Sequence, residues 1–217
     1  LFESIEYFDF PEKKYEHVGF GTVNDEKGNP FKTREGGVKQ LIDLYKDTCA
    51  YLKNINKDLN EETIHELANT VLTYSDLLTN RKTDYKFNLN KFTNISGKTG
   101  IYVQYAQVRA KRLIEKSKDK DTNGELIITN EEERNLIVSL LNLEFYINQS
   151  TKFNEPHHLA NYLYDISNLF NNFYQGENIL SVENEEVKKS KLLITKYFLQ
   201  NSNLVMSCLG INPVNKM

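Results

Sequence analysis

The stretch EPHHLANYLYDISNLFNNF at residues 155–173 decides the fold of this chain. Its apolar residues recur every three or four positions, which is the spacing of one face of an α-helix. They are Leu159, Tyr162, Leu163, Ile166, Leu169 and Phe173. Pro156 suits the start of a helix, because its missing N–H would have no helical partner in the first turn. An apolar stripe this wide needs other helices to cover it, so the stretch predicts a helix inside a bundle.

Further segments have the same period, and they supply the covering helices. We expect these at about residues 38–52, 60–78, 99–118, 129–147 and 185–209. Asn60 is a suitable N-cap, and Thr129 and Glu132 have the spacing of a capping box. Gly210 is a suitable helix terminator. The polar residues 80–98 are expected to form a structured loop.

The residues before 38 have a different character from the rest of the chain. They hold five of the ten glycines and two of the four prolines, the residues that punctuate turns. Residues 17–23, HVGFGTV, alternate as a short strand does, and residues 24–30 are rich in turn formers. One strand is not stable alone, so this unit must join a sheet or pack on the helices. The chain is therefore predicted to be mainly α-helical, with a strand-and-loop unit at its front.

Composition argues against a protein that binds polyanions over its whole surface and against one that spans a membrane. The chain has 217 residues, 26% of them charged, and a formal net charge of −3. This balance excludes a general polyanion-binding coat but permits a local basic stripe. No stretch approaches the roughly 18 apolar residues of a membrane span. Cys49 and Cys208 lie far apart, which suits a reduced cytoplasmic protein. The first residue is Leu1 and not Met, so we expect these residues to be part of a longer chain.

A glycine-flanked basic loop is the first candidate for chemistry. Lys32, Thr33 and Arg34 lie between Gly28 and Gly37, and such a loop could close over a polyphosphate. The alternative is an exposed basic turn. The spacing alone favours that alternative, because short basic turns are common.

Residues 99–120 are the second candidate. Tyr102, Gln104 and Tyr105 precede a run of cations that begins with Arg109, Lys111 and Arg112. Aromatic rings for base stacking, followed by cations for phosphates, are typical of proteins that hold unpaired RNA. The alternative is that the tyrosines belong to the core and the cations solvate a helix face. Composition alone favours this alternative too.

No metal site is predicted. His157 and His158 are adjacent, and adjacent helical residues point about 100° apart, which makes a shared metal ion difficult to bind. The chain also lacks a P-loop, a Gly-x-Ser-x-Gly motif and a recognisable Cys–His pair.

Five stretches, in order, resemble the C-terminal half of the arginyl-tRNA synthetase family. They are HVGFGTV at 17–23, FKTREGGV at 31–38, YSDL at 74–77 with NRKTDYKF at 80–87, TGIYVQYA at 99–106 with Arg109, and EPHHLANYLYD at 155–165. The resemblance covers nearly the whole chain. It implies that residues 1–37 are the remnant of a class I α/β catalytic domain, and that residues 38–217 are a helical stem and anticodon-binding bundle.

The same resemblance implies a function. Family members activate arginine with ATP and Mg²⁺ as arginyl-adenylate and transfer it to the 3′ end of tRNA. Phe31-Lys-Thr-Arg34 occupies the place of the Lys-Met-Ser-Lys-Ser signature, so Lys32, Thr33 and Arg34 are expected to face ATP phosphates in an intact enzyme. The His-Ile-Gly-His signature is absent from these residues. We therefore expect the fragment to lack catalytic residues and activity of its own, to bind no cofactor or metal, and to be a cytoplasmic monomer.

The fragment's own expected task is to dock the anticodon loop. The residues that the resemblance, together with the basic run, assigns to tRNA are Arg81, Asp84, Tyr85, Tyr102, Gln104, Tyr105, Arg109, Lys111, Arg112 and Met217. Tyr162 is expected in the core. The competing hypothesis is a helical protein-interaction module without RNA binding, in which Tyr102 and Tyr105 are buried.

Overall fold

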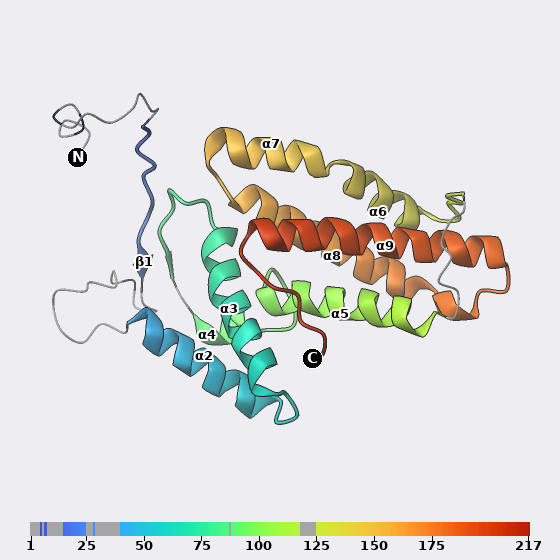
Figure 1. The fold of residues 1–217 in the computed structure, drawn as a ribbon, viewed down its shortest axis with the longest axis horizontal. Coiled ribbons are helices and arrows are strands. Elements are labelled where there is room, and N and C mark those ends of the chain that lie inside the picture. Colours follow the sequence, from blue (N-terminus) through green and yellow to red (C-terminus); the bar gives the residue numbers. More distant parts are fainter. Residues whose placement is uncertain are drawn as a thin grey trace.

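The computed structural model describes residues 15–24, 40–86, 88–117 and 125–217, together with 5, 7 and 28. This part of the chain is mainly helical, as predicted (Figure 1). Its helices are α2 (Leu41–Ile55), α3 (Glu61–Leu78), α4 (Leu89–Phe92), α5 (Gly100–Lys116), α6 (Glu131–Leu141), α7 (Leu143–Phe153), α8 (His157–Gly176) and α9 (Glu185–Cys208), with a 3₁₀ turn, η1, at Ile179–Ser181. The expected ATP-facing residues Lys32, Thr33 and Arg34 lie outside the described residues.

Side-chain caps fix where several helices begin. The Asn60 side chain accepts a hydrogen bond from the backbone N–H of Thr63 (2.8 Å), which confirms the predicted cap of α3. The Thr99 hydroxyl accepts from the N–H of Tyr102 (3.1 Å) at the start of α5. Such bonds satisfy N–H groups that have no partner within the helix. Gly210 follows α9 with φ +70°, the left-handed conformation that ends helices.

The helix predicted over residues 129–147 is divided in two. Asn142 separates α6 from α7, and its N–H bonds to the carbonyl of Ser139, as in a tightened final turn. The cap of α6 is Asn130 and not Thr129, because the Asn130 side chain accepts from the N–H of Glu133 (2.9 Å). Thr129 instead donates to the Glu133 carboxylate. The periodic pattern continues across both helices, so it could not reveal the break.

Helix α8 is the centre of the bundle. It packs against α5, α6, α7 and α9, which surround it in Figure 1. Tyr162, Leu163, Ile166 and Phe170 are fully buried, which confirms the predicted core position of Tyr162. The ring of Phe170 stacks on that of Phe198 from α9, with centroids 4.2 Å apart. The apolar stripe of residues 155–173 therefore faces helices on several sides, as predicted.

A second core lies between α2, α3 and α5. Leu52, Ile64, Val71 and Val108 are buried there, together with Val214 from the segment after α9. Figure 1 shows this final segment turning back from α9 towards α3 and α5. The end of the described chain is thus anchored beside α5.

The front strand is shorter than the predicted residues 17–23. Strand β1 is Val23–Asn24, and it pairs in parallel with β2 (Tyr85–Lys86), which lies in the segment predicted as a loop. Gly21 donates its N–H to the carbonyl of Arg81 (2.5 Å). A Cβ atom at Gly21 would lie 2.7 Å from the carbonyl of Thr83, so only glycine permits this close approach. The front segment therefore packs on the helical part through residues 81–86.

No helix in the described ranges has the length and apolar character needed to cross a lipid bilayer.

One ion pair is buried within the bundle. Glu133 is fully buried and Lys191 of α9 is 2% exposed, and the ammonium of Lys191 donates to the Glu133 carboxylate. Thr129 adds bonds from its backbone N–H (2.6 Å) and hydroxyl (3.0 Å). Burial alone would raise the pKa of Glu133, but the hydrogen bonds from Lys191 and Thr129 outweigh it and hold that pKa below its usual value. Both groups therefore stay charged, and Lys191 is the cation that compensates the buried charge of Glu133.

Replacing Lys191 with methionine should destabilise the chain by about 3–5 kcal/mol near pH 7, because the buried carboxylate loses its cation. Urea unfolding followed by circular dichroism measures this loss. The lowered pKa of Glu133 contributes stability that is present above its unfolded value of about 4.3 and is lost as the pH falls through the folded value. The double variant K191M/E133Q should lose less, since no charge is then left alone. A loss of under about 1 kcal/mol in K191M would mean that the pair behaves as an exposed one.

Candidate nucleic-acid interface

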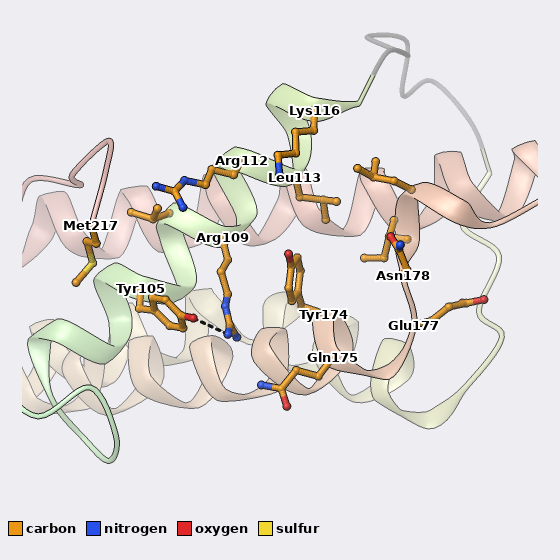
Figure 2. A pocket seen from close by; sticks show the side chains of 13 residues that line it. Tyr105, Arg109, Arg112, Leu113, Lys116, Tyr174, Gln175, Glu177, Asn178 and Met217 are labelled. Carbon is orange, nitrogen blue, oxygen red and sulfur yellow. Dashed lines mark hydrogen bonds between the residues drawn. The ribbon is translucent and has the colours of Figure 1, made fainter. Parts of the chain in front are cut away.

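A groove of about 720 Å³ runs along α5, and we call it the α5 groove (Figure 2). Its other walls are the end of α8, the turn that follows α8, and Met217. Three cations from α5, Arg109, Arg112 and Lys116, line it, with one acid, Glu177, among the remaining lining residues. The groove is therefore electropositive on its α5 side.

Arg109 is the organising side chain of the α5 groove. One guanidinium nitrogen donates to Asn171 Oδ1 of α8 (2.9 Å), and another donates to the hydroxyl of Tyr105 (2.7 Å), the dashed line in Figure 2. Its guanidinium carbon lies 4.1 Å from the ring centre of Tyr105 and 5.3 Å from that of Tyr174. A guanidinium over a ring face is attracted by the ring's quadrupole. Arg109 thus fixes both rings and links α5 to α8.

Helical spacing places two further cations of α5 on the same face as Arg109. Arg112 and Lys116 are three and seven residues beyond Arg109, so all three lie on one face of α5. Both are exposed. Tyr105 is 37% exposed, so part of its ring remains available for stacking. Cations and a ring are thus presented together.

Tyr102 and Lys111 lie on α5 but do not line the groove. Tyr102 is half-buried, its hydroxyl donates to Asn168 Oδ1 (3.0 Å), and its ring lies 5.4 Å from that of Tyr164. Lys111 donates to the side chain of Asn215, in the final segment. Of the expected residues, the structure therefore brings Tyr105, Arg109, Arg112 and Met217 together in the groove. Tyr102 and Lys111 lie outside it.

Gln104 lies in the core. Its amide nitrogen donates to Thr70 Oγ1 (2.9 Å) and to the carbonyl of Asn212 (2.8 Å), and its amide oxygen accepts from the N–H of Val214 (3.0 Å). The side chain is fully buried, so we leave it out of the proposed RNA-contacting surface. It instead anchors the final segment, which ends with Met217 at the groove.

Three expected tRNA contacts, Arg81, Asp84 and Tyr85, meet protein groups. Arg81 donates to the carbonyls of Gly19, Phe153 and Asn154. Asp84 accepts from the N–H of Thr22 (2.6 Å), a bond that lowers the pKa of its carboxyl group.

The hydroxyl of Tyr85 donates to Asp76 (2.9 Å), and burial, together with the Asp76 charge, raises its pKa. In this structure the polar groups of residues 81–85 hold the front segment against the helices. They do not contribute to the α5 groove.

Sequence reasoning missed three residues that line the α5 groove, namely Tyr174, Glu177 and Lys116. Tyr174, which faces Arg109, was not selected, and neither was Glu177, which bonds to Lys191 (3.0 Å). The available signal was an aromatic residue at the polar end of a helix, in Phe173-Tyr-Gln-Gly-Glu177. Lys116 belongs to the same basic run as Arg109, but it was not among the residues expected to contact tRNA.

Comparisons with known proteins find two family models along the chain. Residues 103–217 match the DALR anticodon binding domain model, and residues 2–89 match the model of the class I (R) tRNA synthetase catalytic domain. The domain boundary predicted after residue 37 falls inside the second match.

Curated relatives carry the name arginine–tRNA ligase. The protein from Shewanella pealeana is 33% identical over 215 residues, which is 95% of this chain and 37% of that protein. The protein from Francisella tularensis subsp. novicida is 34% identical over 217 residues, 94% of this chain and 37% of the relative. The chain thus spans 37% of the length of these relatives.

Two solved structures have the same fold. The Thermus thermophilus arginyl-tRNA synthetase superposes with a TM-score of 0.80 at 25% identity, covering 93% of this chain and 35% of that one. The Plasmodium falciparum enzyme gives 0.76 at 27% identity, covering 100% of this chain and 38% of that one. The anticodon-domain match alone exceeds half of the chain. The chain therefore belongs to the arginyl-tRNA synthetase family, within which it corresponds to the end of the class I catalytic domain and the DALR anticodon-binding domain that follows.

Proposed function

We propose that this chain docks the anticodon loop of a tRNA in the α5 groove. The observation that carries the proposal is the arrangement of Arg109 between the rings of Tyr105 and Tyr174, with Arg112 and Lys116 in line beside them. Unpaired RNA is held by rings that stack on bases and by cations that bind phosphates. The family match of residues 103–217 supports the same partner.

The residues of the α5 groove have different tasks in this proposal. Arg112 and Lys116 are exposed and long, so they bind backbone phosphates, which set the position of the loop. Tyr105 offers its free ring surface to a base. Arg109 is already bonded to Asn171 and Tyr105, so it holds the stacking ring in place and adds positive charge. Gln104 acts indirectly, because it positions the segment that ends at Met217.

We also propose that the chain is part of a longer arginine–tRNA ligase. The parent would activate arginine with ATP and Mg²⁺ and transfer it to tRNA, with Lys32, Thr33 and Arg34 facing the ATP phosphates, in the cytoplasm and as a monomer. The family match at residues 2–89 supports this, as do relatives of which the chain spans 37%. The His-Ile-Gly-His signature is not among these 217 residues, and we propose on this basis that the chain alone does not form arginyl-adenylate.

The triple variant R109A/K111A/R112A should bind the tRNA that its full-length relatives charge at least about tenfold more weakly, since it removes the phosphate-binding Arg112 and two further positive charges of α5. The slope of log affinity against log salt should fall by about one, because Arg112 is the phosphate contact among the three. Fluorescence anisotropy across a salt series measures both, and circular dichroism checks that the helices remain.

The matched control is K46A/K53A/K57A, which removes three exposed cations from α2 and its end, away from the α5 groove. Its affinity should stay near that of the unmodified chain. Equal losses in both variants would show that binding depends only on net charge. No loss in either would favour the protein-interaction hypothesis.

The Gln104→Leu variant should loosen the final segment while leaving the helices intact. It removes three hydrogen bonds and leaves the Val214 N–H and the Asn212 carbonyl without partners, at a local cost of about 1–3 kcal/mol each. Hydrogen–deuterium exchange of a peptide covering residues 209–217 should become faster, and tRNA affinity should fall. Unchanged exchange in that peptide would show that Gln104 does not anchor the segment.

The chain alone should form no arginyl-tRNA when it is incubated with arginine, ATP, Mg²⁺ and tRNA. The physical reason is the missing adenylate-forming signature. Acid precipitation of labelled arginine with tRNA is the assay, and charging above a protein-free control would overturn the proposal.

A further inference from the structure

The turn between α7 and α8 brings three potential metal ligands together. Glu155, His157 and His158 each offer one ligand atom, and these atoms lie within 4.8 Å of one another. This is the single group of its kind in the described ranges of the chain. Two imidazoles and a carboxylate form a donor set that suits Zn²⁺.

The geometry differs from the expectation that adjacent histidines diverge. The two rings have centroids 4.2 Å apart and planes inclined by 33°. Asn154 has a left-handed backbone (φ 52°), and His157 is the first residue of α8, so the chain turns sharply just where the ligands lie. His158 Nε2 is 3.4 Å from Glu155 Oε2. The turn, and not helical periodicity, sets the directions of these side chains.

One ring nitrogen of this group is unpaired. Nδ1 of His157 is buried and has no hydrogen-bond partner among the described residues. A buried polar atom without a partner costs free energy, which a bound ligand would recover. The Glu155 side chain is also largely shielded, with 14% of its surface exposed. The group is therefore partly removed from water, so water competes less with a metal ion for these ligand atoms.

A lysine opposes metal binding at this group. The ammonium of Lys82 lies 3.5 Å from Glu155 Oε1. The positive end of the α8 dipole has the same effect. The Lys82 side chain is 65% exposed, so it can turn into solvent when another cation takes its place. Removing this lysine should consequently improve binding.

We propose that Glu155, His157 and His158 bind one Zn²⁺ ion, with water completing the coordination. The site lies next to Phe153 and Asn154 in the sequence. Arg81 donates hydrogen bonds to the carbonyls of these two residues and to the carbonyl of Gly19 in the front segment. A metal ion here stabilises the junction of α7, α8 and the front segment. The proposal does not depend on tRNA binding.

The test is a calorimetric titration of the EDTA-treated chain with Zn²⁺. We expect one ion per chain and at least about tenfold weaker binding in each of H158A and E155Q. Lys82→Met should bind several-fold more tightly. Zn²⁺ should raise the melting temperature of the unmodified chain but not that of H158A, because binding to the folded state alone stabilises it. Circular dichroism without metal confirms that each variant is folded.

Two controls exclude other ligands. His17→Ala removes an exposed histidine outside the group and should leave binding unchanged. Co²⁺ provides a spectroscopic probe, and its spectrum should lack thiolate charge-transfer bands, which excludes Cys49 and Cys208. The proposal is overturned by the absence of saturable Zn²⁺ binding in the micromolar range, by binding that persists in both H158A and E155Q, or by a thiolate spectrum.

Discussion

Helix α8 is stable only where other helices cover it, because its apolar residues face several directions at once. The stack of Phe170 on Phe198 fixes it against α9, and the fully buried Tyr162 and Ile166 fill the space towards its other neighbours. Close packing leaves little freedom in how these helices lie. The position of α5 along α8 follows from this constraint, and with it the distance at which Arg109 reaches Asn171 and Tyr174. The α5 groove is therefore a product of the core beneath it.

Arginine side chains in this chain illustrate how packing decides the use of a charge. Arg81 and Arg109 were both expected to contact RNA, Arg81 from the family resemblance and Arg109 from the basic run as well. Arg81 donates hydrogen bonds to three carbonyl groups from distant segments, and these bonds join the front segment to the bundle. Arg109 uses two donors within a groove that stays open to solvent. The guanidinium of Arg81 therefore stabilises the fold, whereas that of Arg109 is presented in a groove that a ligand can reach.

Periodicity and caps predicted most of the long helices, including the start of α3 at Asn60 and the end of α9 at Gly210, but not the short α4, which lies in the segment expected to be a loop. They were insufficient where long-range contacts decide. The short strand β2 exists because the front segment pairs with it, and the break at Asn142 leaves the apolar pattern unchanged. In the α5 groove, ring and charge spacing made Tyr105, Arg109 and Arg112 candidates, and the family resemblance was needed to prefer them over a purely structural role. Tyr174 was not, since its partner Arg109 lies on another helix.

The buried amide of Gln104 has a consequence for the order in which the chain folds. Its partners at Asn212 and Val214 are 108 and 110 residues away, whereas α5 itself is complete much earlier in synthesis. Until residues 212–214 have been synthesised, the amide can bond to Thr70 but must keep its other hydrogen bonds to water. The side of α5 that carries Gln104 therefore stays partly hydrated until then. The second core closes there only when residues 212–214 arrive.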